Sequence, residues 1–203
     1  VLEALENAKK NLHIPVVYNC GGYETAETIG ALSEYVDIWL PDLKYYSPIL
    51  SRRYSQAEDY FAVASRAVEQ MIRLTGPPEF GEYKDKRSGT ACSILRKGVI
   101  IRHMVLPGHK DDSIRLLYWM KDTLPKGGFL ISLMSQYTPF YRSADYPEIN
   151  RRITTYEYEK VLNTAIELGL TDGFMQEKSS AKEEYTPPFD LEGCLLYTSD
   201  AAD

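Results

Sequence analysis

Small clusters of polar residues follow the four clearest apolar runs of the sequence. They are Asn19-Cys20-Gly21-Gly22, Asp42 with Lys44, Arg102-His103 leading to Pro107-Gly108-His109 at the end of their strand, and Gln136-Tyr137-Thr138. Because the carboxyl ends of parallel strands open on the same rim of an α/β sheet, we expect these clusters to converge on one pocket. Convergence of this kind is typical of almost any α/β enzyme, so it predicts a binding site without defining its chemistry.

Charged residues carry most of the chemistry that these clusters could perform. Asp42 and Lys44 lie two residues apart and so point to the same side of an extended segment. They could hold the ammonium and carboxylate of a zwitterionic ligand, or they could form a solvated salt bridge. Arg102 lies inside an apolar strand, where its guanidinium needs an anionic partner, either a ligand or Asp42. Since Arg102 alternates with His103, only one of them faces the interior.

The cluster that follows the first strand has two interpretations. Gly21-Gly22 could let backbone amides approach a ligand, or it could form a plain tight turn, since the full Gly-rich spacing of a phosphate loop is absent. Cys20 could be a reactive thiol or a small residue that fills a crowded turn. The separated histidines and cysteines match neither zinc nor iron–sulfur spacings, so the sequence predicts no metal ligands.

Composition excludes several classes of protein. The 203 residues carry 23 Lys and Arg against 29 Asp and Glu, a net charge of −6, which argues against nucleic-acid binding. The apolar runs fall far short of the roughly 20 residues that a membrane span needs. Three scattered cysteines predict no disulfide framework and a reducing compartment, the cytoplasm. The 44% of hydrophobic residues is enough for a substantial core.

Alternating strands and helices must position the polar clusters. Apolar, β-branched runs predict strands at residues 15–19, 36–40, 98–106 and 129–134. Helical spacing predicts helices at 1–12, 24–35, 59–74 with Asp59 as N-cap, up to Lys121 with Asp111 or Asp112 as N-cap, and from Thr154 to Gly169 with a Thr154–Glu157 capping box. The polar residues 79–96 are expected to form an exposed loop. This order predicts parallel βα units.

Both ends of the chain look cut. The first residue is Val1, within a helical pattern and without a segment that would cap it, so we expect sequence to be missing upstream. Residues 194–203 resemble the in-frame translation of a common transposase sequencing adapter and are set aside as non-native. Residues 1–193 are therefore expected to form one incomplete domain.

Six ordered blocks give the chain a resemblance to a known family. They are YNCGGYE (18–24), VDIWLPDLKY (36–45), RRYS (52–55), VIIRHMVLPGH (99–109), LMSQYTP (133–139) and GFMQ (173–176). In these blocks the chain resembles the C-terminal two-thirds of a radical S-adenosylmethionine (SAM) protein related to the pyruvate formate-lyase activating enzymes. The resemblance implies a partial (β/α)6 barrel with four parallel strands retained and the N-terminal strands missing.

The same resemblance implies the cofactors and the residues near them. A 4Fe-4S cluster would reduce SAM to methionine and a 5′-deoxyadenosyl radical that abstracts hydrogen, with the protein positioning the reactants. By position, Asn19 and Cys20 match the family's polar pair after the third barrel strand, and Asp42 and Lys44 match its Asp-x-Lys after the fourth. Arg102 matches an arginine of the fifth strand. The full set of expected cofactor-binding residues is Asn19, Cys20, Gly21, Gly22, Asp42, Lys44, Arg102, Gln136 and Tyr137.

The chain also departs from the family's pattern. The CxxxCxxC loop that holds the cluster belongs upstream of Val1, so the fragment itself is expected to be inactive while its parent is an oxidoreductase. Cys20 and Tyr137 stand where activating enzymes proper have Thr and His. The implied partners are a reductant such as flavodoxin or ferredoxin, and a substrate that is either a small molecule or a protein like a glycyl radical enzyme. The alternative function is a non-catalytic α/β barrel fragment or a module that binds a nucleotide-like ligand.

Overall fold

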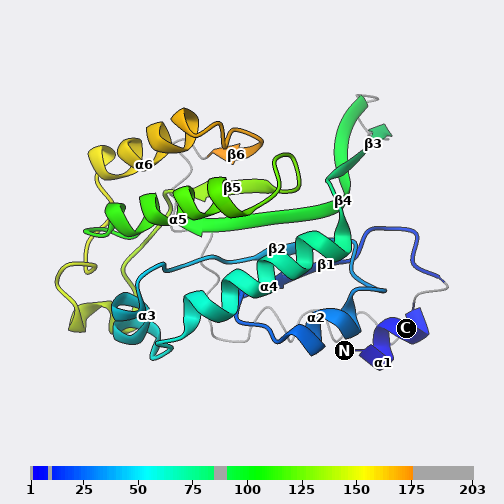
Figure 1. Cartoon of the computed structure of the whole chain (residues 1–203), viewed down its shortest axis with the longest axis horizontal. Helices are drawn as coiled ribbons and strands as arrows, with labels where there is room; N and C mark the ends of the chain where they lie inside the picture. The colour runs from blue at the N-terminus through cyan, green and yellow to red at the C-terminus, as the bar shows by residue number, and fades with distance from the viewer. Residues whose placement is uncertain (1, 9–10, 85–90, 176–203) are drawn as a thin grey trace, which may run out of the picture.

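The computed structural model describes residues 2–8, 11–84 and 91–175. The elements follow in the order α1 (Leu2–Ala8), β1 (Val17–Cys20), α2 (Ala26–Leu32), β2 (Ile38–Pro41), α3 (Pro48–Ser55), α4 (Tyr60–Thr75), β3 (Glu79–Lys84), β4 (Ala91–Met104), α5 (Lys110–Thr123), β5 (Leu130–Met134), a 3₁₀ helix (Tyr141–Asp145), α6 (Thr155–Glu167) and β6 (Gly173–Met175) (Figure 1). Residues 194–203 lie outside the described residues, so their assignment as non-native and the domain boundary at 193 stay predictions.

A mostly parallel sheet forms the centre of the fold. Its strands lie in the order β1-β2-β4-β5-β6, every neighbouring pair is parallel, and β3 pairs antiparallel with β4. Among the described residues the sheet does not close on itself, which agrees with a partial barrel. The expected count of four parallel strands was too low, because β6 is only three residues long and too short to show a period in the sequence.

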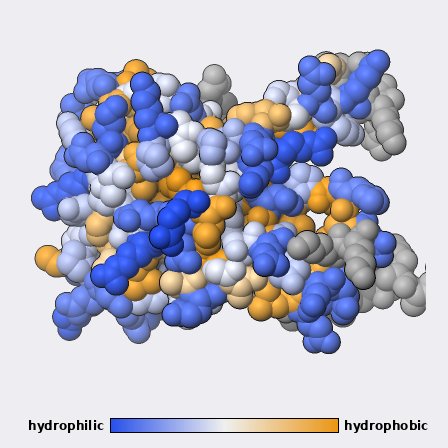
Figure 2. Space-filling view, turned by 45° about the vertical axis from the view of Figure 1, so that its right-hand side comes forward, coloured by the Kyte–Doolittle hydropathy of each residue, from blue (hydrophilic) through white to orange (hydrophobic). Residues whose placement is uncertain are grey.

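The prediction of a loop at residues 79–96 was wrong for 79–84 and 91–96, and residues 85–90 lie outside the described residues. β3 and the first half of the 14-residue strand β4 form a hairpin that projects from the body of the molecule (Figures 1 and 2). Most of its side chains are exposed, including Phe80 and Tyr83. A ribbon with neither face buried has no need to alternate polar and apolar residues, so the usual strand signal is absent from its sequence.

The core lies on one face of the sheet. Along β4, the alternate residues Val99, Ile101 and His103 are at most 1% exposed, whereas Ile100 and Arg102 between them and Met104 after them are half-buried. Val99 and Ile101 belong to one apolar cluster with side chains of α2, α4, α5 and α6, and α4 and α5 cross the near side of the sheet in Figure 1. Arg102 therefore faces away from the helices, on the opposite face from His103.

One of the three helix starts differs from its expected N-cap. Asp59 does precede α4 but makes no capping bond, because its carboxylate accepts a hydrogen bond from the Tyr23 hydroxyl. His109, rather than Asp111 or Asp112, is the N-cap residue of α5. The capping box of Thr154 and Glu157 at the start of α6 is confirmed.

The remaining helices have slightly different ends from those predicted. α1 ends by Ala8, so Leu12 lies outside it. None of the helices among the described residues is long and apolar enough to cross a membrane.

Candidate functional site

A cavity of about 330 Å³ opens at the carboxyl edge of the sheet. Its lining residues come from the ends of β2, β4 and β5, and they are Asp42, Lys44, Tyr45, Arg102, Met104, Leu106, Met134, Gln136 and Tyr137. Five of the nine residues predicted to bind a cofactor are therefore brought together from three separate strands. The volume lies within the range of small-molecule sites, about 300 to 1,000 Å³.

An ion-paired group of three side chains gives the cavity its charge. Arg102 Nε and Nη2 lie 2.8 and 2.6 Å from Asp42 Oδ1, and Lys44 Nζ lies 3.6 Å from Asp42 Oδ2. Asp42 is thus the anionic partner of Arg102 that the sequence suggested. Two cations against one carboxylate leave a positive excess, which favours an anionic or zwitterionic ligand.

The backbone that carries Asp42 and Lys44 is held by the side chain of Tyr60. The Tyr60 hydroxyl accepts a hydrogen bond from Lys44 N at 3.1 Å. It shares its own hydrogen between Asp42 O at 2.8 Å and Gly21 O at 3.0 Å. Burial raises the pKa of Tyr60, so the hydroxyl stays protonated and remains a donor.

The rest of this segment is held from β4 and α5. His103 Nδ1 lies 2.6 Å from Leu43 O. The Asp112 carboxylate accepts hydrogen bonds from Tyr46 N and Ser47 N, each at 2.9 Å. Side chains from three elements thus fix segment 42–47. Sequence reasoning missed Tyr60 and Asp112 in this role, because their partners lie 16 to 66 residues away and leave no local signal.

The four predicted residues at the end of β1 do not line the cavity. Gly22 has φ +80°, and a side chain there would collide with the Asp42 carbonyl, so glycine is needed for close packing of backbone segments. Gly21 has open space around it and Asn19 is exposed. Burial raises the pKa of the Cys20 thiol to about 12, with Glu24 and Asp42 adding repulsion. A protonated thiol fits the interpretation of Cys20 as a filler of a crowded turn.

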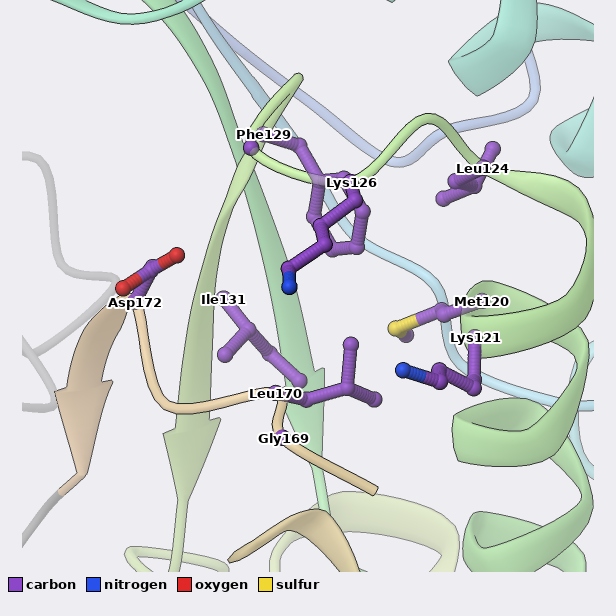
Figure 3. A pocket seen from close by; sticks show the side chains of 10 residues that line it. Met120, Lys121, Leu124, Lys126, Phe129, Ile131, Gly169, Leu170 and Asp172 are labelled. Carbon is purple, nitrogen blue, oxygen red and sulfur yellow. The ribbon is translucent and has the colours of Figure 1, made fainter.

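A second cavity lies at the amino edge, between α5 and β5. It measures about 60 Å³ and is lined by Lys121, Lys126 and Asp172 above an apolar base that includes Ile131 and Leu170. Figure 3 shows both lysine side chains pointing into the opening. Across the described part of the chain neither lysine forms an ion pair. Its small size makes this cavity a poor site for a cofactor.

The described residues offer no metal centre. Within ranges 2–8, 11–84 and 91–175, no group of three or more His, Cys, Asp or Glu side chains is placed to hold a metal ion. Cys20 is half-buried at the end of β1, whereas Cys92 is exposed on the hairpin. The described residues therefore do not fit a 4Fe-4S cluster.

Comparison with known proteins finds a relative by sequence and a solved structure with a similar fold. No family profile matches the chain. An uncharacterized protein of Methanocaldococcus jannaschii is 31% identical over 167 residues, which are 81% of this chain. The chain spans only 41% of the length of that curated relative.

Among solved structures, a domain of a pyruvate-formate lyase-activating enzyme from Bacteroides vulgatus aligns with a TM-score of 0.56. The alignment covers 87% of this chain and 89% of that domain, at 10% sequence identity. The two chains share a fold. The expected likeness to an activating enzyme is thus shown at the level of architecture, and any chemistry has to be argued from the site.

Proposed function

We propose that the chain is part of a radical SAM enzyme of the activating-enzyme-related group, and that its carboxyl-edge cavity binds S-adenosylmethionine. The proposal depends on one observation above all. Asp42, Lys44, Arg102, Gln136 and Tyr137, which the sequence resemblance selects, line one cavity in a fold shared with an activating-enzyme domain.

The donor set of the cavity suits the methionyl part of SAM. The carboxylate of Asp42 would hold the ligand's ammonium group, and Lys44 and Arg102 would hold its carboxylate. Gln136 adds an amide, which can donate and accept hydrogen bonds. Met104, Met134 and the rings of Tyr45 and Tyr137 add apolar surface for the rest of the molecule. Bound SAM supplies a sulfonium whose reductive cleavage yields a carbon radical.

The cluster that would reduce SAM needs ligands from outside the described residues. No catalytic step is therefore assigned to the residues of this chain, whose part is to bind and orient SAM. A reductant such as flavodoxin or ferredoxin, and a substrate that is a protein or a small molecule, belong to the same proposal for the whole enzyme.

Calorimetric titration of the 203-residue chain with SAM tests the proposal. We expect Lys44→Met to weaken binding about tenfold, the effect of losing one charge-assisted contact. The matched control is Lys121→Met, which removes the same charge at the amino edge and should leave the affinity unchanged.

Three results would contradict the proposal. The first is a chain that does not bind SAM. The second is an equal effect of the two lysine variants. The third is binding of ATP or adenosine as tight as that of SAM, which would favour a nucleotide-binding module instead.

A further inference from the structure

We propose that His103 is a positioning residue of the SAM site, which acts from the buried side of the sheet by holding the carbonyl of Leu43 between Asp42 and Lys44. This inference rests on the function proposed above. His103 does not line the cavity, and its side chain is 1% exposed.

Neighbouring residues of β4 hold segment 42–44 from both faces of the sheet. On the cavity face, the Arg102 guanidinium binds Asp42, while the Arg102 carbonyl accepts the Leu43 N–H at 2.8 Å. On the helix face, the His103 ring reaches Leu43 O at 2.6 Å. The backbone N–H and C=O of Leu43 are thus both held, by two consecutive residues of β4.

The imidazole completes a strand pairing that stops at this point. Pairing between the segment after β2 and β4 ends with the parallel bridge of Asp42 and Arg102. The carbonyl of Leu43 lies beyond this bridge, and Leu43 itself is fully buried. A buried carbonyl without a partner would be costly, so a side-chain N–H is needed there.

The protonation of the ring follows from its surroundings. Because a carbonyl oxygen only accepts, Nδ1 must carry the hydrogen that Leu43 O receives. Nε2 is then an acceptor, and it is buried without a hydrogen-bond partner among the described residues. Burial lowers the pKa of His103 and keeps the ring neutral, although the Leu43 bond and the charges of Asp112 and Asp42 act in the opposite direction.

The hydrogen bonding of His103 distinguishes a residue that positions the backbone from one that only packs in the core. A side chain that only filled the core would be better apolar, because one nitrogen of the imidazole is buried unsatisfied. The hydrogen bond to Leu43 is the contact that accounts for a histidine at this position. It links the core of the molecule to the direction in which Asp42 and Lys44 present their charges.

Three variants of the 203-residue chain test the inference. His103→Asn keeps a nitrogen donor that is separated from Cα by the same number of bonds as Nδ1, but the smaller side chain leaves space in the core. His103→Leu fills the core and removes the donor. Ile101→Ala is the matched control, since Ile101 lies two residues earlier on the same buried face and does not contact Leu43 O through a hydrogen bond.

SAM affinity and thermal stability should rank these variants in different orders. We expect His103→Leu to weaken SAM binding about tenfold, and His103→Asn to keep it within about threefold of the unmodified chain. Ile101→Ala should lower the melting temperature and leave the affinity unchanged. Unchanged affinity in a folded His103→Leu variant, or equal losses in the Leu and Asn variants, would overturn the inference.

Hydrogen exchange of the ligand-free chain separates this inference from the proposed function. The peptide that contains residues 42–47 should exchange faster in His103→Leu than in the unmodified chain and in His103→Asn. If the unmodified chain binds no SAM while this exchange order holds, the proposed function fails and the positioning role stands. If SAM binds but the exchange is the same in all variants, the positioning role fails alone.

Discussion

Both edges of the sheet carry charged side chains beside a cavity, but the two edges are built differently. At the carboxyl edge, Asp42, Lys44 and Arg102 are joined at distances of 2.6 to 3.6 Å around a cavity of about 330 Å³. At the amino edge, Lys121 and Lys126 extend into a hollow of about 60 Å³, and Lys126 also lines a cavity of about 420 Å³ with Glu69 and Arg73. In the described part of the chain neither lysine forms an ion pair.

The difference shows what distinguishes a site from a charged surface. The backbone of segment 42–47 is fixed by Tyr60, His103 and Asp112 before any ligand binds. Groups held in advance lose less conformational entropy when a ligand arrives. Charge at a sheet edge is therefore a weak sign of function, whereas charge on a segment held by buried side chains is a stronger one.

The largest expected effect concerns the reactivity of the two described cysteines. The pKa of Cys20 is raised to about 12, so at pH 8 its thiolate population should be about a thousandfold below that of an ordinary thiol. Cys92 is exposed on the hairpin and serves as an internal reference. A time course of iodoacetamide labelling at pH 8, read by peptide mass spectrometry, should show Cys92 modified first. Equal rates would mean that the carboxyl edge is not packed as described.

The second effect concerns Glu157, which ties α6 to the loop after β4. Its carboxylate accepts bonds from Gly108 N at 2.7 Å and from Arg151 at 2.7 and 2.9 Å, as well as from Thr154. We expect Glu157→Gln to lower the free energy of unfolding by about 2 to 3 kcal/mol in urea denaturation, because one buried carboxylate serves several donors. Asp172→Asn at the amino edge should leave stability unchanged. A similar loss in both variants would remove the contrast between the edges.

This stability difference should depend on pH in a defined direction. The hydrogen bond from Arg151, with those from Thr154 and Gly108, holds the pKa of Glu157 well below its ordinary value of 4.5. The stabilisation is therefore complete above pH 4.5 and is lost as the pH falls toward the folded-state pKa. The gap between the unmodified chain and Glu157→Gln should be the same at pH 7 and pH 6, and clearly smaller at pH 3. A gap that widened on acidification would refute the role of the ionised carboxylate.

Local patterns predicted the parts of the fold that depend on neighbouring residues. The four apolar runs correspond to β1, β2, β4 and β5, and the capping box at Thr154 needs only a spacing of three residues. The convergence of Asp42, Arg102 and Gln136 followed from strand order alone. These features could be predicted because periodicity and topology determine them.

The parts that were missed depend on long-range contacts. Asp112 fits a helix start in the sequence, but its carboxylate binds backbone 65 and 66 residues earlier. Tyr60 reads as one apolar residue among others at the start of α4, although its hydroxyl binds three backbone groups. The hairpin of β3 and β4 was missed for a different reason: neither of its faces is buried, so its sequence does not alternate polar and apolar residues. No local pattern encodes which buried side chains fix a site.

The smallest effect comes from one of these missed residues and bears most directly on the contrast between the edges. Tyr60→Phe keeps the ring that stacks on Tyr23 and packs edge-on against Tyr45, and it removes only the hydroxyl. Lys44 N, Asp42 O and Gly21 O then lose a partner, so we expect a loss of about 1 kcal/mol in unfolding free energy and a SAM affinity a few-fold weaker. Tyr118→Phe, at a half-exposed position on α5, is the control and should change neither quantity. If Tyr60→Phe lowered stability without affecting SAM binding, the contacts that fix segment 42–47 would serve folding stability alone. The fixed backbone at the carboxyl edge would then no longer support a ligand-binding role.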